Sequence, residues 1–404
     1  MALVVQKYGG SSFETPDAIM LVAKRIIDTY DSCNDVVVVV SAKTGVTNRL
    51  IALTHELCIS PEGPDYDLVI ATGEQTVVGL LTLCLNNMGY KATSYLGWQV
   101  PVITDSNHGR ASITSVEPGR IQKDLKKGAI VVVAGFQGIS DKGRVTTLGR
   151  GGSDVTAVAL ADVLGADICE IFTDLDGIYT ADPTICKEAR KIDKISYDEM
   201  LELASLGEQA LQVRALEYAK YHNVTLCVRS QFNRNAGTLV TTEDEDMERI
   251  IVSGIVYDKN EAKIAVMGVP DKPGIAAKIL TALADADISV DMIVQNVSQA
   301  GLADVTFSIS KSDLELARKI TNAIAAEIHA KEVIADEKIS KISIVGLGMR
   351  NHAGVAARMF SALAFNNINI QMISTSEIKV AVAIEEKYTE LAVRVLHETF
   401  GLSY

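Results

Sequence analysis

One short run of the sequence, residues 147–154, combines the residue types that bind a small anion. Its chemistry-bearing members are Arg150, Gly151, Gly152, Ser153 and Asp154. A glycine-rich turn that opens a helix presents backbone N–H groups and a positive dipole end to an anion. A guanidinium can hold a carboxylate or a phosphate through two parallel hydrogen bonds. The run therefore predicts a small-anion site, whereas a glycine pair alone would favour an ordinary flexible loop.

A lysine stands at the end of the first predicted strand, residues 3–6. Lys7 is followed closely by Gly9 and Gly10, so the backbone can approach a phosphate while the lysine reaches it. The order of residues is not that of a Walker loop, because the chain has no Gly-Lys-Ser/Thr sequence here. An ordinary turn with a solvated lysine explains this motif equally well when it is taken alone.

Small hydroxyl side chains follow the valine-rich strand predicted at 36–40. Ser41 and Thr47 lie beyond its carboxyl end, which is the edge where ligands of open α/β sheets gather. They therefore suit contacts to a substrate. Capping of the next helix by Thr47 or Asn48 is compatible with the same residues.

Carboxylates occur at two further places that suit a ligand. Glu74 lies in the apolar helix predicted over 68–88, where the dipole of a helix start favours an acidic side chain. It is either a dipole-stabilising residue or the partner of a substrate ammonium group. In the stretch 173–183, Asp176 and Asp182 are ordinary turn residues. Carboxylates and a tyrosine at a strand end can also hold a nucleotide and its magnesium ion, and both interpretations stay open.

The elements around these residues have the pattern of a layered α/β domain with a mostly parallel sheet, because apolar strands alternate with amphipathic helices. The strands are expected at 3–6, 36–40, 129–134 and 167–173, and the helices at 16–30 and 68–88. The β-branched run 36–40 suits a strand that is buried on both faces. The polar, acidic segment 233–248 is expected to be the linker that leaves this domain.

An internal repeat follows the expected linker. Residues 271–277 resemble 351–357, and 288–293 resemble 368–373 at the same offset. Each copy is predicted to contain a strand, a helix, two strands and a helix. This length fits a duplicated small domain rather than a solenoid unit. We expect the strand before the first copy, 250–256, to pack with the second copy.

Length and charge limit the classes of protein that the chain can be. Its 404 residues suffice for two or three domains, and its net charge of −13 argues against nucleic acid and anionic membrane surfaces as main partners. The six cysteines include no Cys-x-x-Cys pair and the six histidines form no ligand-spaced cluster, so we expect reduced thiols and no protein-bound metal. No signal-peptide pattern and no membrane-spanning apolar run is evident, which predicts a cytoplasmic protein.

Taken together, these motifs resemble the aspartokinase family over essentially the whole chain. The similar stretches of the first part are 7–12, 73–74, 135–138, 147–154 and 173–183. The repeat resembles the tandem ACT domains of that family, especially at 295–296, 348–355 and 373–377. The resemblance implies an α/β fold, the amino-acid kinase fold, followed by two ferredoxin-like βαββαβ ACT domains. The implied boundaries are 1–242 for the kinase domain, 263–337 for the first ACT domain, and 250–258 plus 341–404 for the second.

The resemblance also implies a reaction, the transfer of a phosphoryl group from ATP to the side-chain carboxylate of L-aspartate. The nucleophile has a reference pKa of about 3.9 and is already ionised, so it needs no general base. Catalysis would consist of charge neutralisation and alignment, with Mg²⁺ carried by the nucleotide. The product, 4-phospho-L-aspartate, would enter the synthesis of lysine, threonine and methionine.

Individual residues receive roles from the resemblance. Lys7 and Asp154 would be catalytic, Arg150 would hold the α-carboxylate of the substrate, and Glu74 would hold its ammonium group. The other implied substrate contacts are Ser41, Thr47, Phe136, Gly151, Gly152 and Ser153. The implied nucleotide contacts are Lys7, Tyr8, Gly9, Gly10, Thr173, Asp174, Tyr179, Asp182, Thr184 and Gln209.

The ACT domains imply feedback regulation by lysine, threonine or both. The implied effector residues are Asp271, Gly274, Ile275, Ala276, Gln295, Asn296, Met349, Val355, Asn369, Ile370 and Ser376. Helix-start turns at Gly274 and Gly354 are the alternative interpretation of two of these motifs. By resemblance, ACT domains pair between chains, which predicts a homodimer or a larger oligomer.

Two positions depart from the family pattern on the nucleotide side. Thr184 stands where the family commonly has arginine, and Gln209 where it commonly has lysine. Each charged contact is worth about 1.5–3 kcal/mol, so their loss predicts weak ATP binding unless Lys43 compensates for it. These departures support a second hypothesis beside an active aspartokinase, a non-catalytic paralogue that senses amino acids or binds a partner. A third hypothesis is a kinase for a related acidic amino acid, because Arg150 and Glu74 indicate an α-amino acid but not the length of its side chain.

Overall fold

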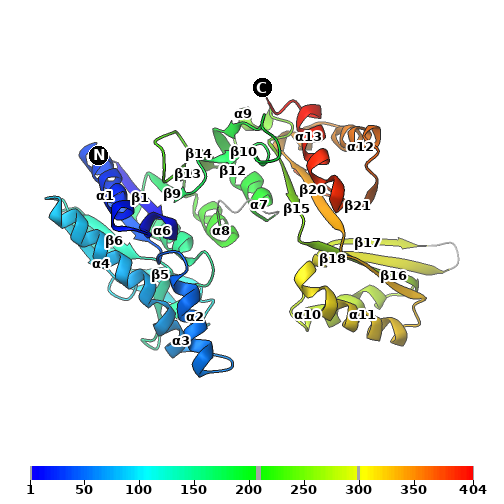
Figure 1. The fold of residues 1–404 in the computed structure, drawn as a ribbon, viewed down its shortest axis with the longest axis horizontal. Helices are drawn as coiled ribbons and strands as arrows, with labels where there is room; N and C mark the ends of the chain where they lie inside the picture. The colour runs from blue at the N-terminus through cyan, green and yellow to red at the C-terminus, as the bar shows by residue number, and fades with distance from the viewer. Residues whose placement is uncertain (1, 206–210, 298–300, 404) are drawn as a thin grey trace. The chain divides into compact units, whose positions relative to one another are not determined.

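The chain forms two compact units in the computed structural model (Figure 1). The described residues are 2–205, 211–297 and 301–403. The first unit contains 2–178, 191–204 and 211–244, and the second contains 179–190 and 245–403. This division differs from the continuous first domain predicted at 1–242. The segment 179–190 belongs to the second unit because its residues Ala181 and Cys186 are buried in the core of that unit.

An eight-stranded sheet lies at the centre of the first unit, in the order β12-β14-β13-β9-β1-β2-β6-β3. All neighbouring pairs are parallel except β13 and β14. The strands are β1 (Leu3–Tyr8), β2 (Asp35–Val40), β3 (Ala92–Tyr95), β6 (Ile130–Ala134), β9 (Ile168–Thr173), β12 (Lys194–Ser196), β13 (Leu226–Ser230) and β14 (Thr238–Thr241). The four strands predicted from the sequence all lie in this mostly parallel sheet.

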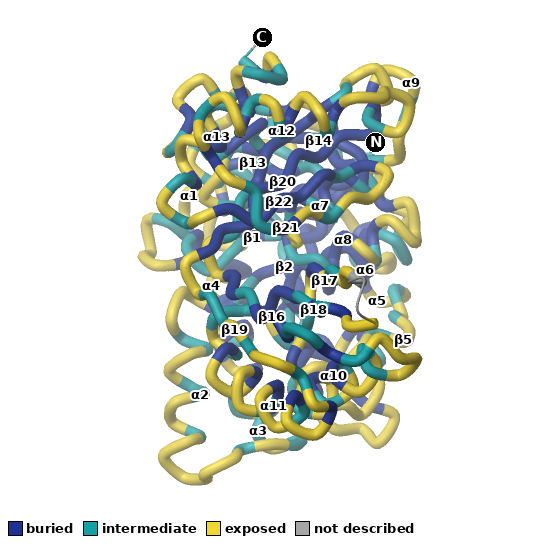
Figure 2. The backbone as a smooth tube through the Cα atoms, turned by 90° about the vertical axis from the view of Figure 1, so that its right-hand side faces the viewer, coloured by how far each residue is buried: buried dark blue, intermediate teal, exposed yellow. Residues whose placement is uncertain are grey.

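The valines of β2 are buried on both faces of the sheet, as predicted. Val36, Val38 and Val40 belong to a core cluster that also includes residues of α1 (Pro16–Asp31) and α4 (Thr72–Asn87). Side chains alternate along a strand, so the other valines face the opposite side. There, α6 (Gly152–Leu164) contacts β1, β2 and β9, and α8 (Val213–His222) contacts α6. Helices therefore enclose the central strands β1 and β2, which are dark blue in Figure 2.

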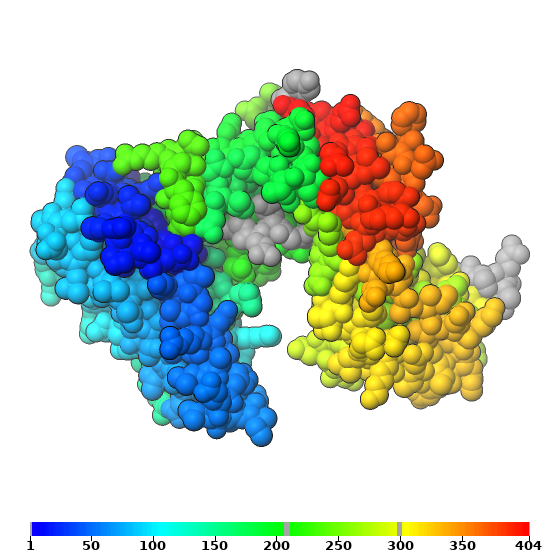
Figure 3. Space-filling view, viewed as in Figure 1, coloured from blue at the N-terminus to red at the C-terminus, as the bar shows by residue number. Residues whose placement is uncertain are grey.

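A second, four-stranded sheet of the first unit has the order β5-β4-β7-β8. Its strands are β4 (Val102–Thr104), β5 (Ile113–Val116), β7 (Gln137–Ser140) and β8 (Val145–Thr147). Helix α3 (Pro64–Ile70) contacts β8, and α2 (Val46–Leu57) contacts α3. None of the residues of α2 is buried, and the helix lies on the surface, in blue in Figure 3. The other elements in this part of the sequence are α5 (Gly119–Leu125), α7 (Tyr197–Ser205), β10 (Ile178–Tyr179) and β11 (Lys191–Ile192).

The single helix predicted over 68–88 is two helices, because α3 ends at Ile70 and α4 begins at Thr72. Read as one stretch, Pro64–Asn87 is long and apolar enough by composition to cross a membrane, contrary to the sequence-based expectation. Half of its most apolar part is buried inside the protein. This burial is the pattern of a core helix, and it supplies the apolar partners that the composition requires.

The prediction that 233–248 is a linker is wrong for the middle of this segment. Thr238–Thr241 forms β14, which lies between β12 and β13 in the main sheet. Thr238 and Val240 are fully buried, and the alternation of side chains leaves their neighbours less buried. The acidic residues that follow form α9 (Glu245–Glu248). The overall polarity of the segment hid a strand of four residues.

Two four-stranded antiparallel sheets form most of the second unit, in the orders β17-β18-β16-β19 and β15-β20-β22-β21. The strands are β15 (Gly254–Asp258), β16 (Glu261–Pro270), β17 (Val290–Val297), β18 (Leu302–Ser310), β19 (Glu332–Asp336), β20 (Ile339–Val345), β21 (Ile370–Thr375) and β22 (Lys379–Glu385). The helices are α10 (Ile275–Ala284), α11 (Leu314–Glu327), α12 (Val355–Phe365) and α13 (Thr389–Thr399). Each copy of the repeat thus has the predicted order of elements.

The fourth strand of each sheet comes from a different place in the chain, after the first copy for one sheet and before it for the other. In the first sheet β19 pairs with β16, and in the second sheet the corresponding place beside β20 is taken by β15. Strand β15 precedes the first copy in the sequence and pairs with the second copy, as expected, but it covers 254–258 rather than the predicted 250–256. The two sheets also contact each other, through β16 with β20 and β17 with β21. Between them, Lys341 is buried and contacts Glu261 at 2.8 Å.

Candidate active site

A cavity of about 400 Å³ lies where the carboxyl ends of β1 and β2 meet the first turns of α4 and α6. We call it the Arg150 cavity. It is lined by all the residues predicted to be catalytic or to bind substrate, namely Lys7, Ser41, Thr47, Glu74, Phe136, Arg150, Gly151, Gly152, Ser153 and Asp154. These residues are distant in the sequence, and the parallel strands bring them to one edge of the sheet.

Lys7 and Asp154 form an ion pair in this cavity. Lys7 Nζ lies 2.6 Å from Asp154 Oδ1, and the two side chains are 12% and 9% exposed. The contact has the distance of an ion pair without the alignment of a hydrogen bond, since Asp154 Oδ1 has no hydrogen-bond partner among the described residues. A lysine ammonium carries three donors. Lys7 can therefore stay beside Asp154 and still bind an incoming anion.

Glu74 presents a partly satisfied carboxylate to the same cavity. It lies in the first turn of α4 and is 3% exposed. Its Oε1 accepts a hydrogen bond from the Ala42 N–H at 2.9 Å, whereas Oε2 is buried with no hydrogen-bond partner in the described part of the chain. Burial raises the pKa of Glu74 to about 7, against the lowering effect of the backbone hydrogen bonds. A cationic group of a ligand would satisfy the remaining oxygen.

Arg150 stands on a loop whose backbone shape requires glycine. Gly149 and Gly151 on either side have φ values of 74° and 71°, a region that glycine adopts without steric cost. A Cβ on Gly151 would lie 2.0 Å from Gln212 Cγ. Gly151 is also the N-cap residue of α6, so the free N–H groups of the helix start lie next to Arg150. Within the described ranges no carboxylate pairs with the exposed Arg150 side chain, which is available to an anion.

The sequence left two features of this lining undecided, namely the role of Thr47 and Asn48 and the backbone conformation at Phe136. The N-cap residue of α2 is Gly45, with no side-chain capping bond, so the capping interpretation of Thr47 and Asn48 is wrong. Both residues line the Arg150 cavity instead. Phe136 has a φ of 70°, which is uncommon and strained for a bulky residue. Strain of this kind is concentrated at functional sites, where the surrounding structure holds it.

Some of the residues predicted to bind nucleotide lie at the ends of β1 and β9. Thr173 ends β9, and the next residue, Asp174, accepts a hydrogen bond from Ser11 Oγ at 2.8 Å. The ring of Tyr8 is fully buried and stacks on Phe172, with the centroids 4.5 Å apart. The predicted contact of Tyr8 is therefore restricted to its backbone, because its phenol belongs to the core.

The turn after β1 is closely packed. Gly9 and Gly10 follow the strand, and a Cβ on Gly10 would lie 2.6 Å from the Ala42 carbonyl oxygen. The sequence therefore needs glycine where this turn approaches the end of β2. Lys43, considered above as a compensating cation, donates a hydrogen bond from Nζ to the Glu14 carbonyl at 2.6 Å.

The remaining described residues of the predicted nucleotide set belong to the second unit. Tyr179 ends β10, and Asp182 accepts hydrogen bonds from Thr184 Oγ1 at 2.6 Å and from Tyr257 Oη at 2.8 Å. Burial raises the pKa of Asp182, but these hydrogen bonds outweigh it and hold the pKa below its usual value. Gln209 lies outside the described residues.

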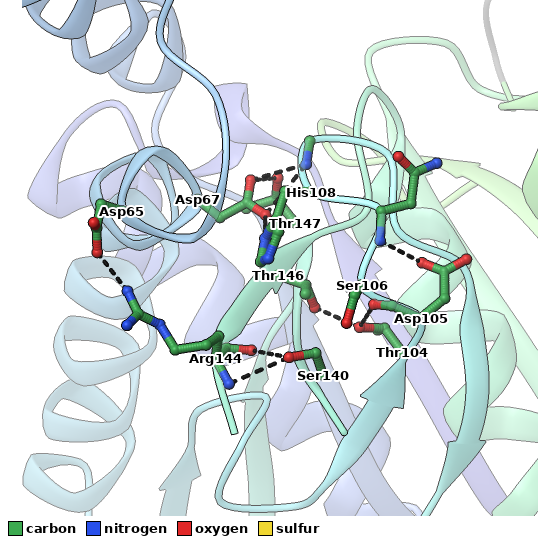
Figure 4. Close-up of polar contacts among 12 residues, drawn as sticks. Asp65, Asp67, Thr104, Asp105, Ser106, His108, Ser140, Arg144, Thr146 and Thr147 are labelled. Carbon is green, nitrogen blue, oxygen red and sulfur yellow. Dashed lines mark hydrogen bonds and ion pairs between the residues drawn. The ribbon is translucent and has the colours of Figure 1, made fainter. Parts of the chain in front are cut away.

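The structure adds residues that the sequence motifs did not single out. Further lining residues of the Arg150 cavity include Ile51, Tyr66, Ile70 and Gly109. Behind the lining, Asp67 of α3 is a fully buried carboxylate (Figure 4). An acidic residue in the first turn of a helix is ordinarily explained by the helix dipole, with the side chain in solvent. The burial of Asp67 is therefore apparent only in the folded structure.

The predicted effector residues lie at corresponding places in the two copies of the repeat. Gly274 and Gly354 are the N-cap residues of α10 and α12, with φ values of 95° and 92°. This geometry agrees with a helix-start turn and with an effector site, so the two interpretations stay open. Strands β17 and β21 are edge strands of their sheets. Close to these helix starts and edge strands lie Asp271, Ile275, Ala276, Gln295, Asn296, Met349, Val355, Asn369, Ile370 and Ser376.

Comparison with known proteins identifies the family. The model of the amino acid kinase family matches residues 2–230, and two ACT-domain models match 263–326 and 342–400. The chain is 52% identical to an aspartate kinase of Stutzerimonas stutzeri over 403 residues, and 52% identical to the aspartokinase of Pseudomonas aeruginosa over 404 residues. Each alignment covers 100% of this chain and 98% of the relative.

The solved structures agree with this comparison. E. coli aspartokinase III in complex with lysine and aspartate superposes with a TM-score of 0.81 at 25% identity, covering 98% of this chain and 99% of that one. The crystal structure of aspartate kinase from Synechocystis matches with a TM-score of 0.55 at 40% identity, covering 99% of this chain and 70% of that one. The predicted fold class is confirmed. This chain belongs to the aspartokinase family, with an amino-acid kinase domain followed by two ACT domains.

Proposed function

We propose that this protein transfers the γ-phosphoryl group of ATP to the side-chain carboxylate of L-aspartate, giving 4-phospho-L-aspartate. Its relatives are named aspartate kinases, and E. coli aspartokinase III is described in complex with aspartate and ADP. One observation carries the assignment to these residues. Arg150, which has no carboxylate partner in the described ranges, and the unpartnered Oε2 of Glu74 line one cavity with the Lys7–Asp154 pair.

The acceptor side of the cavity matches an α-amino acid. The Arg150 guanidinium binds the α-carboxylate of the substrate through two parallel hydrogen bonds. The substrate ammonium donates to Glu74 Oε2, and its charge favours the ionised form of Glu74. Hydroxyls on Ser41, Thr47 and Ser153 are available for further contacts. The side-chain carboxylate of the substrate is then the group left to react.

Charge neutralisation is the main catalytic task, because an anionic nucleophile must approach an anionic phosphoryl group. Lys7 binds oxygens of the transferring phosphoryl group, and Asp154 keeps Lys7 oriented. The N–H groups of Gly9 and Gly10 and of the α6 start are further donors. No cluster of three or more metal-ligating side chains occurs in the described ranges. Mg²⁺ is therefore proposed to be held by the phosphate oxygens of the nucleotide itself.

A paralogue with weakened ATP binding is the second candidate, and it has its own supporting observation. Thr184 donates its hydroxyl to Asp182, so this position offers a neutral group where the family commonly has arginine. The proposed nucleotide contacts are Lys7, Tyr8 through its backbone, Gly9, Gly10, Thr173, Asp174, Tyr179, Asp182, Thr184 and Gln209.

Regulation by lysine, threonine or both is proposed for the ACT domains. E. coli aspartokinase III is described in complex with lysine, which supports lysine as one effector. The proposed pockets adjoin the starts of α10 and α12. An edge strand presents unpaired backbone groups that another chain can bind. The edge strands β17 and β21 therefore support the proposed pairing of ACT domains in a homodimer or larger oligomer.

A coupled assay tests the proposed reaction by following ADP release with ATP, Mg²⁺ and L-aspartate. We expect aspartate-dependent turnover that Arg150→Ala greatly reduces, because the α-carboxylate loses its partner. Absence of aspartate-dependent turnover at saturating ATP would refute the proposal. Calorimetry separates the second candidate, since binding of lysine or threonine without binding of ATP would favour a sensing paralogue.

A further inference from the structure

A buried carboxylate on α3 joins two loops that reach the Arg150 cavity (Figure 4). Asp67 is fully buried. Its Oδ1 accepts hydrogen bonds from Thr147 Oγ1 at 2.5 Å and from the Gly109 N–H at 3.1 Å. Its Oδ2 lies 2.7 Å from His108 Nδ1. One side chain therefore connects the loop at 108–109 with the end of β8, where the arginine-bearing run begins.

The same two loops are tied together a second time. The Ala111 N–H donates to the Thr147 carbonyl at 2.9 Å. Arg214 of α8 donates to the Leu148 carbonyl at 2.6 Å and to the Ala111 carbonyl at 3.0 Å. The side chain of Thr147 and the carbonyl groups of Thr147 and Leu148 are thus held by three different parts of the chain, and both Asp67 and Arg214 contribute a charged group.

The loops also pack closely where they enter the cavity. Gly109 and Gly149 both line the Arg150 cavity, and a Cβ on Gly149 would lie 3.0 Å from the Gly109 carbonyl oxygen. Gly149 directly precedes Arg150 in the chain. Because these loops have so little room, a shift of the loop at Gly109 displaces Gly149 and with it the backbone of Arg150, the next residue.

We propose that Asp67 is a positioning residue for the amino-acid substrate, because it sets the place of the Arg150 loop through Thr147 and Gly109. This inference rests on the proposed function of the Arg150 cavity. Asp67 itself is not one of the residues that line the cavity. It acts through hydrogen bonds to the loops and makes no contact with the substrate.

The hydroxyl of Thr147 allows a matched test. Thr147→Val removes the hydrogen bond to Asp67 at nearly constant volume, and Thr147→Ser restores the hydroxyl. The neighbouring Thr146 is the control, because it is equally buried but bonds to Thr104 Oγ1 at 2.6 Å and not to Asp67. Steady-state kinetics of the full chain then give KM for aspartate, KM for ATP and kcat for Thr147→Val, Thr147→Ser and Thr146→Val.

We expect Thr147→Val to raise KM for aspartate about tenfold with little change in kcat or in KM for ATP, as for loss of uniform substrate binding. Thr147→Ser should remain near wild type, and Thr146→Val should leave KM for aspartate unchanged. An unchanged KM for aspartate in Thr147→Val, or an equal rise in Thr146→Val, overturns the inference. Asp67→Asn, which keeps the size of the side chain, replaces Thr147→Val if the latter does not fold.

Failure of the proposed function has a different signature. A wild-type protein with no aspartate-dependent turnover refutes the proposed reaction and leaves the positioning inference to a binding measurement. Calorimetric titration of L-aspartate into the same variants then decides it. A weaker affinity in Thr147→Val but not in Thr146→Val supports the inference, and equal affinities, or no aspartate binding by the wild-type protein, overturn it.

Discussion

Replacement of Glu74 by glutamine should stabilise the fold and weaken aspartate binding at the same time. Oε2 of Glu74 is buried with no hydrogen-bond partner in the described ranges, and burial raises the pKa of the carboxyl to about 7. Glutamine keeps the size of the side chain and an oxygen that can accept from the Ala42 N–H, which now donates to Oε1. The variant lacks the buried charge, and it also lacks the anion that we propose as the partner of the substrate ammonium.

The size of this stabilisation follows from two pKa values of Glu74, the ordinary value of 4.5, taken for the unfolded chain, and about 7 in the folded protein. The folded state binds the proton more tightly, so wild-type stability falls as pH rises through this window. Below the window both states are protonated and the charge has no cost. Each pKa unit corresponds to about 1.4 kcal/mol, so Glu74→Gln should be more stable than wild type by about 3 kcal/mol above the window.

The effect on binding has the opposite sign. A hydrogen bond to a charged group is worth about 1.5–3 kcal/mol, and its loss corresponds to a rise of about ten- to a hundredfold in KM for aspartate. Denaturant unfolding of wild type and Glu74→Gln at about pH 5 and about pH 8, with aspartate titrations near neutrality, measures both effects. A stability difference that does not grow with pH, or an unchanged KM for aspartate, refutes this reasoning.

Three further predictions concern backbone shape, a buried ion pair and the nucleotide side. Gly151→Ala places a Cβ where φ is 71° and another side chain is in the way, and should lower the unfolding free energy by about 1–3 kcal/mol in a urea titration; an unchanged midpoint would contradict this. Lys341→Met leaves the buried Glu261, 2.8 Å away, without its cation and should cost about 3–5 kcal/mol in the same titration. Glu261→Gln in that background should recover part of the loss. The double variant Thr184→Arg, Gln209→Lys should lower KM for ATP at least about tenfold, and no change would show that these positions do not limit ATP binding.

The layered domain could be predicted because its central strands are long and apolar. The valine run at 36–40 has the composition of a strand buried on both faces, and the structure buries it there. Strand β14 has only four residues and is followed by acidic ones, so composition pointed to a linker. Its place in the sheet is set by pairing with β12 and β13, which no local pattern contains.

No local sequence pattern indicated that residues 179–190 belong to the second unit. Its turn residues predicted a loop near a nucleotide, and they say nothing of the unit in which that loop packs. Ala181 and Cys186 decide this by their burial in the core of the second unit. Small apolar residues that lie between turn-forming residues become core residues only through tertiary packing.

The residues that line the Arg150 cavity could be predicted from the sequence, whereas the hydrogen bonds of Asp67 behind the lining could not. Glycine-rich turns and charged residues at strand ends have recognisable types and spacings, and the structure brings them together. Asp67 has no such spacing, because its partners His108, Gly109 and Thr147 are far away in the sequence. Long-range hydrogen bonds of this kind appear only once the fold is known.

The most direct test of the proposed reaction is the formation of an acyl phosphate on L-aspartate, trapped with hydroxylamine as the hydroxamate. We expect aspartate hydroxamate whose formation requires ATP and Mg²⁺, is lost in Lys7→Met, and is strongly reduced in Arg150→Ala. Wild-type protein that gives no hydroxamate at saturating ATP and aspartate, or an equal yield from Lys7→Met, would contradict it.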